Sequence, residues 1–109
     1  MKLIIAIIHE KDQRYLQDAL RENNFQFTNV SSTGGFLREG NVTLMIGVDD
    51  EQVDDVMNVF RYNCSSREQY LNMMPTLDPS AGGVMPSPVK VVIGGAILFV
   101  VDVERFEKI

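Results

Sequence analysis

Hydrophobic and polar positions divide the first part of the chain into a strand followed by a helix. Residues 3–8 form a short, continuous and largely β-branched apolar run, which predicts a strand buried on both faces. Across residues 11–23 apolar side chains recur at three- and four-residue steps, which predicts an amphipathic helix. The pair Asn23-Asn24 predicts its end, since asparagine tolerates the left-handed conformation that often terminates helices.

The same pattern is repeated with two strands and a second helix. Residues 25–31 alternate aromatic and polar side chains, and residues 41–48 place Val42, Leu44 and Ile46 on one face. Both segments are predicted strands. Residues 49–51 are all acidic, which favours a helix N-terminus, and an apolar stripe at helical spacing follows from Val53 to Phe60.

The regular pattern stops after Cys64. Residues 65–88 contain all four prolines of the chain and the pair Gly82-Gly83, so we expect a long loop without regular structure. Two apolar runs, residues 89–93 and 96–101, then flank Gly94-Gly95, which predicts a hairpin. Residues 102–109 form a charged tail in which Phe106 is the one large anchor.

The order of elements predicts the fold class. We expect a single domain over residues 1–109, an α+β ferredoxin-like βαββαβ sandwich with an extra C-terminal strand. Two helices would then cover one face of an antiparallel sheet. The bare second face would carry apolar side chains such as Phe25, Phe27 or their strand neighbours, which predicts oligomerisation.

Charge and cysteine content exclude several classes of protein. The net charge is -5, with 10 basic and 15 acidic residues. The basic residues form no stripe along the sequence, which argues against binding to DNA or RNA. The lone Cys64 cannot form an internal disulfide and fits a reducing compartment. The apolar run of residues 3–8 is too short to span a bilayer. We therefore expect a cytoplasmic protein with no membrane insertion.

Residues for catalysis or metal binding are scarce. His9 is the only histidine and stands at a predicted strand end, and Cys64 has no histidine near it in the sequence. The acidic residues after position 48 lack the spacing of a calcium loop and are read as a helix start. The sequence therefore predicts a protein that is not an enzyme and that holds no metal and no cofactor.

One segment is more specific. Residues 33–41 join two predicted strands through Gly34-Gly35, whose backbone N–H groups can bind an anionic oxygen. Phe36 and Leu37 are costly on an open loop unless something covers them, and a planar base is one candidate. Arg38 can pair with a phosphate. The alternative is a long hairpin whose Phe36 docks on a neighbouring subunit.

This segment also carries a resemblance to a known family. The matching motifs are STGGFLR at residues 32–38, GNVT at 40–43, MIGV at 45–48, REQ at 67–69 and VIGGA at 92–96. Together they resemble the PII-like cyclic di-AMP receptor family of Gram-positive bacteria. The resemblance implies a homotrimer whose sheets face inward, with a short loop at about residues 32–41 and a long loop at about 65–88. It also implies that cyclic di-AMP binds between subunits without turnover and that the loops signal to an unidentified protein partner. We therefore predict a receptor for cyclic di-AMP or a related adenine nucleotide.

The resemblance extends to individual positions. Those that match ligand-facing positions of the family are Asn24, Thr28, Gly35, Phe36, Leu37, Asn41 and Gly47, with Phe99 on a strand lining the cleft. The sequence departs from the family in three places. Residues 76–79 read TLDP where relatives carry a Pro-Met-Gly-Gly-like turn. Gln26 replaces the usual arginine, and the tail ends in residues 106–109 rather than in a His-Gln-aromatic pattern. Lys108 could supply a charged hydrogen bond there. With Arg38, these residues complete the predicted ligand-binding set.

A second function stays open at this point. Gln26 and the altered tail are also what a constitutive trimeric interaction scaffold would show if it had kept the fold and lost the nucleotide. Such a scaffold would hold a protein partner through residues 65–88.

Overall fold

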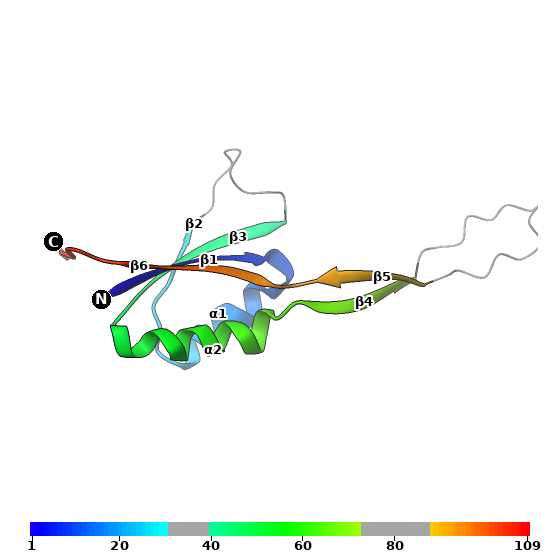
Figure 1. The fold of residues 1–109 in the computed structure, drawn as a ribbon, viewed down its shortest axis with the longest axis horizontal. Helices are drawn as coiled ribbons and strands as arrows, with labels where there is room; N and C mark the ends of the chain where they lie inside the picture. The colour runs from blue at the N-terminus through cyan, green and yellow to red at the C-terminus, as the bar shows by residue number, and fades with distance from the viewer. Residues whose placement is uncertain (31–39, 73–87) are drawn as a thin grey trace, which may run out of the picture.

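The fold is built from short helices and strands that follow one another closely along the chain (Figure 1). The computed structural model describes residues 1–30, 40–72 and 88–109. The elements in chain order are β1 (Lys2–His9), η1 (Glu10–Asp12), α1 (Gln13–Glu22), β2 (Thr28–Val30), β3 (Asn41–Val48), η2 (Asp50–Gln52), α2 (Val53–Cys64), β4 (Arg67–Asn72), β5 (Pro88–Ile93) and β6 (Ala96–Asp102).

The main sheet has four strands in the order β2-β3-β1-β6, and every neighbouring pair is antiparallel. Helices α1 and α2 lie together on one side of this sheet (Figure 1). The core forms between the sheet and these helices, where alternate strand residues meet the apolar stripe of each helix. The residues of the core are Ile4, Ala6, Ile8, Leu16, Leu20, Leu44, Ile46, Val48, Val56, Phe60 and Cys64.

The opposite face of the sheet has no helix on it, as the sequence predicts, but different residues supply its apolar surface. Phe25 and Phe27 pack against the core on the helix side, so the prediction that they line the bare face was wrong. The register places Ile5 beside Phe99 and Ile7 beside Ile97 on the open face. Phe99 is 54% exposed and Ile97 is 58% exposed.

The end of α1 explains why the following strand is shorter than predicted. Asn24 has a φ of 61°, as the left-handed helix stop requires. Its N–H donates to the Arg21 carbonyl (3.0 Å) and the Phe25 N–H donates to the Leu20 carbonyl (2.8 Å), which together form a Schellman motif. This turn directs Phe25 towards the core instead of into the sheet, so strand structure begins only at β2.

The third quarter of the chain differs most from the prediction. Regular structure was not expected within residues 65–88, yet β4 occupies Arg67–Asn72 and pairs with β5 in a separate two-stranded sheet, called here the ribbon. The predicted hairpin at Gly94-Gly95 was also wrong, because β5 pairs with β4 while β6 pairs with β1. Gly94 and Gly95 have φ values of 77° and 94°, and they form a kink between two strands that belong to different sheets.

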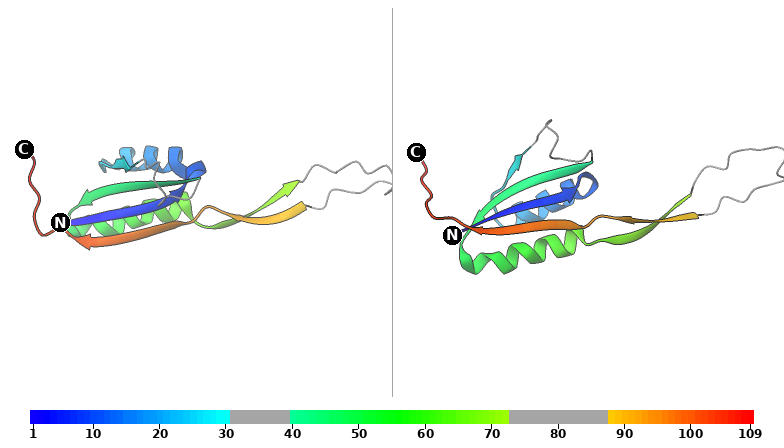
Figure 2. Two further views of the ribbon diagram at one scale, coloured as in Figure 1. Left: turned by 90° about the horizontal axis from the view of Figure 1, so that it is seen from above. Right: turned by 45° about the horizontal axis from the view of Figure 1, so that its top comes forward.

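The ribbon leaves the body at one end of the main sheet, and the N-terminus lies at the other end (Figure 2). The additional pairing in this α+β protein is therefore the inserted ribbon rather than an extra C-terminal strand, and β6 is the strand beside β1. The arrangement is compatible with a ferredoxin-like sandwich. Within the three described segments, no helix is long and apolar enough to cross a membrane.

Candidate ligand-binding site

A surface hollow of about 340 Å³ brings together three of the predicted ligand-binding residues. Gln26 and Thr28 reach it from the segment around β2, and Gly47 reaches it from the end of β3. Thr28 is opposite Met45 in the β2–β3 register, so the strand pairing itself places the hydroxyl next to the floor of the hollow. We call this the β2 hollow; its lining is Met1, Gln26, Phe27, Thr28, Met45, Gly47 and Phe106.

The chemistry of the β2 hollow is that of a neutral ligand surface. It offers an amide at Gln26, a hydroxyl at Thr28, and aromatic carbon at Phe27 and Phe106. A Cβ on Gly47 would lie 3.4 Å from the Met1 side chain, which is an ordinary van der Waals contact, so Gly47 only leaves the floor slightly more open than alanine would. No lining side chain carries a charge. The hollow can therefore bind an aromatic base through stacking and hydrogen bonds, but its side chains supply no cation to a phosphate.

Asn41 lies at the opposite end of the same strand. It lines a second hollow of about 310 Å³ at the root of the ribbon, together with His9, Ser66, Gly94 and Gly95. Six residues of extended strand separate Asn41 from Gly47, or about 20 Å at roughly 3.4 Å per residue. One chain therefore does not bring these two predicted residues into a single site.

Three other predicted residues lie apart from both hollows. Asn24 is exposed and terminates α1 through its backbone. Phe99 is on the open face, in one cross-strand row with Ile5, Met45 and Thr28, but two strands lie between it and β2. Lys108 is exposed in the tail beyond β6. The predictions for Gly35, Phe36, Leu37 and Arg38 fall outside the described residues.

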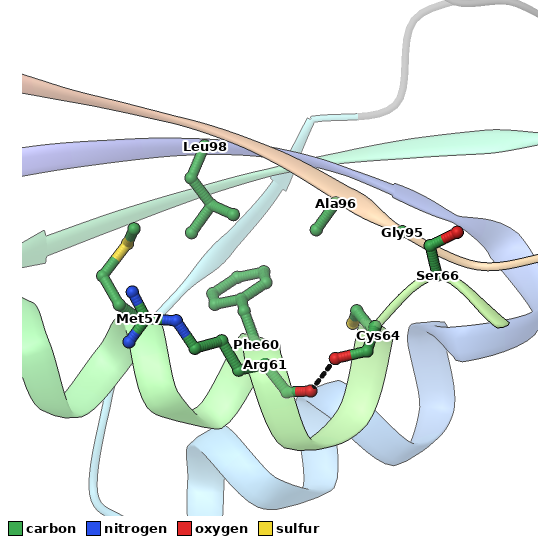
Figure 3. A pocket seen from close by; sticks show the side chains of 9 residues that line it. Met57, Phe60, Arg61, Cys64, Ser66, Gly95, Ala96 and Leu98 are labelled. Atoms are coloured by element: carbon green, nitrogen blue, oxygen red, sulfur yellow. Dashed lines mark hydrogen bonds between the residues drawn. The ribbon is translucent and has the colours of Figure 1, made fainter.

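A third hollow, of about 350 Å³, lies between α2 and β6 and contains none of the predicted residues (Figure 3). Phe60, Leu98 and Cys64 face one another across it, and Arg61 lies along its side (Figure 3). Burial raises the pKa of the Cys64 thiol to about 12, and the negative charge of Asp12 adds to this shift. The thiol is therefore neutral near pH 7, and Cys64 offers no thiolate nucleophile to this hollow.

Sequence reasoning missed part of the β2 hollow. Phe106 was read only as an anchor for the tail, yet it lines the hollow while remaining 65% exposed. Phe27 was predicted only as part of an apolar sheet surface, with no role in a hollow, and Met1 was not considered. The only signal in the sequence for the role of Phe106 was that it is the one aromatic residue in a charged tail. Its contact with the hollow beside β2 depends on tertiary structure.

The fold and these hollows define a small α+β protein with an open apolar sheet face and a neutral, base-sized surface site. Comparison with known proteins assigns it more closely. A sequence profile of the family described as "Cyclic-di-AMP receptor" matches residues 1–109. The chain therefore belongs to the cyclic-di-AMP receptor family, which confirms the resemblance found in its motifs.

A solved structure supports the same fold. It is the crystal structure of a functionally unknown protein from Pediococcus pentosaceus ATCC 25745, which is 37% identical to this chain. The two superpose with a TM-score of 0.75, and the match covers 99% of this chain and 96% of the other. The likeness therefore includes nearly the whole length of both proteins.

Proposed function

We propose that this protein is a non-enzymatic receptor that binds cyclic di-AMP between the subunits of a homotrimer. The observation that carries the proposal is the family match over residues 1–109, combined with the grouping of Gln26, Thr28 and Gly47 in one hollow. The bound state would be communicated to an unidentified protein partner in the cytoplasm through residues 32–41 and 65–88.

The open face of the sheet supports assembly. Ile5, Ile7, Ile97 and Phe99 form an apolar surface that the helices of the same chain leave uncovered. A contiguous apolar surface on a small protein favours association, because burying it removes that area from water. Three such faces turned towards one axis would cover each other.

The separation of the predicted residues supports a site made by two chains. The β2 hollow and Asn41 lie at opposite ends of β3, so a ligand that uses both must contact two different subunits. A hollow of about 340 Å³ is also at the small end of ligand sites, which span roughly 300–1,000 Å³. The neighbouring subunit would supply the opposite wall.

The residues of the hollow suit an adenine base. The Gln26 amide and the Thr28 hydroxyl both donate and accept, as the edge of adenine requires, and Phe106 provides an aromatic face. Gly35 and Arg38 would contact the phosphates, while Phe36 and Leu37 would cover the second face of the base. No group in this set acts as a nucleophile paired with a base, so we expect binding without turnover.

The proposal is tested by isothermal titration of the purified full chain with cyclic di-AMP, after its oligomeric state has been measured by light scattering. We expect a trimer and saturable binding, with Thr28→Val and Phe36→Ala each weakening affinity by about 5- to 20-fold because each removes one contact to the base. Tyr15→Ala on the exposed face of α1 is the control and should leave affinity unchanged.

No heat and no thermal shift at high micromolar ligand would refute the ligand assignment. A protein that captures its partner equally well with and without nucleotide would identify the scaffold function instead. Recovery of unmodified cyclic di-AMP after prolonged incubation with stoichiometric protein is expected, and release of a cleaved product would refute the non-enzymatic assignment.

A further inference from the structure

An ion pair with one buried partner lies where the ribbon joins the body: the Asp12 side chain is 4% exposed, and the Arg67 side chain is 48% exposed. Asp12, the last residue of η1, is only 3% exposed and is the buried charged residue of the described chain. Its Oδ1 accepts a hydrogen bond from Arg67 Nη2 at 2.8 Å, and Arg67 is the first residue of β4. This hydrogen bond and the charge of Asp12 raise the pKa of Arg67 further above its already high value.

The junction between β5 and β6 closes over this pair. A Cβ on Gly94 would lie 2.7 Å from Arg67 Nη1, 3.0 Å from the Ser65 carbonyl oxygen and 3.2 Å from Asp12 Oδ2, and the φ of 77° also favours glycine, so a larger residue would crowd this junction. The next residue, Gly95, donates its N–H to the Cys64 carbonyl at the end of α2 (2.5 Å). Both strands of the ribbon are therefore held to the body at one point, and Asp12 is at its centre.

The same short helix also holds the edge of the second hollow. At the other end of η1, the Glu10 N–H donates to the carbonyl of Gly40 at 2.8 Å. Gly40 precedes Asn41, a predicted ligand-binding residue that is in register with His9. The three residues of η1 thus connect the start of β3 with the start of β4.

This ion pair differs from a surface pair because the Asp12 carboxylate is buried. Asp12 Oδ2 is buried and has no hydrogen-bond partner among the described residues, so Arg67 is the main compensation for the buried charge. A buried charge tolerates little movement of its partner, because separating the two leaves it unpaired. Because Arg67 itself is about half exposed, the burial of Asp12 is what favours keeping the contact.

We propose that Asp12 is a positioning residue that fixes the ribbon to η1 and makes the position of the ribbon depend on the Gly40–Asn41 edge of the ligand site. Asp12 does not touch the ligand. Ligand contact at Asn41 shifts Gly40 and η1, and the Asp12–Arg67 pair carries that shift to β4. The coupling to ligand rests on the proposed function, which identifies the ligand. The anchoring of the ribbon by Asp12 does not depend on the proposed function.

The anchoring is tested by hydrogen exchange on the full chain without ligand. In Asp12→Asn we expect the backbone amides of residues 67–72 and 88–93 to exchange about tenfold faster, because the ribbon loses its fixed root. The control is Glu68→Gln, which removes an exposed ion pair with Lys90 (3.0 Å) inside the same ribbon. Since exposed pairs contribute little, its exchange rates should stay within about twofold of the parent.

The coupling is tested by repeating the exchange with saturating cyclic di-AMP. In the parent, ligand should change the exchange of the ribbon. Asp12→Asn should bind with an affinity within about threefold of the parent, since Asp12 is not a ligand contact, yet its ribbon should no longer respond. Arg67→Lys keeps the positive charge with a single donor group, so its ribbon should retain part of the response to ligand. If Asp12→Asn does not fold, the response of Arg67→Lys decides whether the ion pair couples the ribbon to the ligand.

The outcomes separate the two proposals. A parent protein that does not bind cyclic di-AMP would refute the proposed function, while the ligand-free comparison would still decide whether Asp12 anchors the ribbon. Ribbon exchange in Asp12→Asn that equals that of Glu68→Gln would overturn the inference. A ribbon that responds to ligand equally in Asp12→Asn and in the parent would overturn it as well.

Discussion

The two faces of the main sheet are made by the same strands but are completed differently. Ile4 and Ile5 are neighbours in the sequence and identical in side chain, yet Ile4 is fully buried beneath the helices while Ile5 is only partly buried on the open face. Residues on both faces are apolar, so hydrophobicity alone does not distinguish them. The chain supplies a cover for one face and leaves the other available to another chain.

The difference extends to polar groups. The covered face contains no predicted ligand residue, whereas the open face has Thr28 and Gly47 at one end and Asn41 at the other. We therefore expect substitutions on the covered face to affect folding of the subunit, and substitutions on the open face to affect what the folded subunit binds. Substitutions on each face should separate stability from assembly and ligand affinity.

The largest expected effect is on the covered face. Phe60 is 2% exposed in the core, so Phe60→Ala should lower the free energy of unfolding by about 3–5 kcal/mol. Tyr62→Ala, two residues further along the same helix and 90% exposed, should change it by less than about 0.5 kcal/mol. Urea denaturation followed by circular dichroism measures both, and equal losses would contradict the burial of Phe60 between the helix and the covered face.

A charge on the open face should act on assembly instead. Ile97→Glu places a carboxylate in the apolar surface, and we expect folded monomers with native circular dichroism in place of a trimer, because a charge buried at the contact is costly. Val100→Glu lies on the same strand and alternates to the opposite face, with 41% exposure, and it should remain a trimer. Light scattering after gel filtration distinguishes them. A trimer that persists in the Ile97→Glu variant would show that another surface joins the subunits.

A cation in the β2 hollow should strengthen ligand binding. The lining has no charged side chain, and Gln26→Arg introduces one at the edge of the hollow. A charge-assisted hydrogen bond to phosphate contributes about 1.5–3 kcal/mol, so affinity for cyclic di-AMP should rise by roughly 10- to 150-fold. The gain should shrink at high salt, and Gln26→Met, which adds no charge, should give none. An unchanged affinity in Gln26→Arg would show that phosphate does not bind near this side chain.

The smallest effect is a pH dependence of the covered face. Burial raises the pKa of Cys64 to about 12, above the value of about 8.5 for a free thiol. The unfolded chain therefore loses this proton first, and native stability should fall between about pH 9 and pH 11 by up to about 1.4 kcal/mol per pH unit from this group. Below about pH 8 both states keep the proton and no slope arises.

Cys64→Ala separates this contribution from those of other groups that titrate at high pH. The difference in unfolding free energy between the parent and Cys64→Ala should decrease steadily across this range. A difference that stays constant with pH would mean that the thiol is not shielded from water in the native state.

The local parts of the fold could be predicted because their causes are local. The periodicity of residues 11–23 and 53–60 identified both helices, and the left-handed stop at Asn24 followed from its side chain. The strand pairing on either side of Gly94-Gly95 could not be predicted, and the hairpin expected there does not form. The glycines indicated a change of direction, but the choice of β4 and β1 as partners depended on strands that lie far from these glycines in the sequence.

The predicted ligand-binding residues divide in the same way. Their types and order were readable from the motifs, including Gln26, Thr28 and Gly47. The predicted strand over residues 41–48 already implied that Asn41 and Gly47 lie about 20 Å apart, at roughly 3.4 Å per residue. That Phe106 joins Gly47 in one hollow, while Asn41 lines another, depends on tertiary contacts that the sequence does not state.

The sequence by itself determined the family, the helices, most strand positions and the apolar character of both faces of the sheet. These properties depend on side-chain type and short-range spacing, which the chain states directly. Only the tertiary structure decided which apolar face is covered, how β4 and β5 form a ribbon, and that Asp12 is buried against Arg67 at its root. Each of these depends on contacts between segments far apart in the chain, whose free energy arises only when the whole fold brings them together.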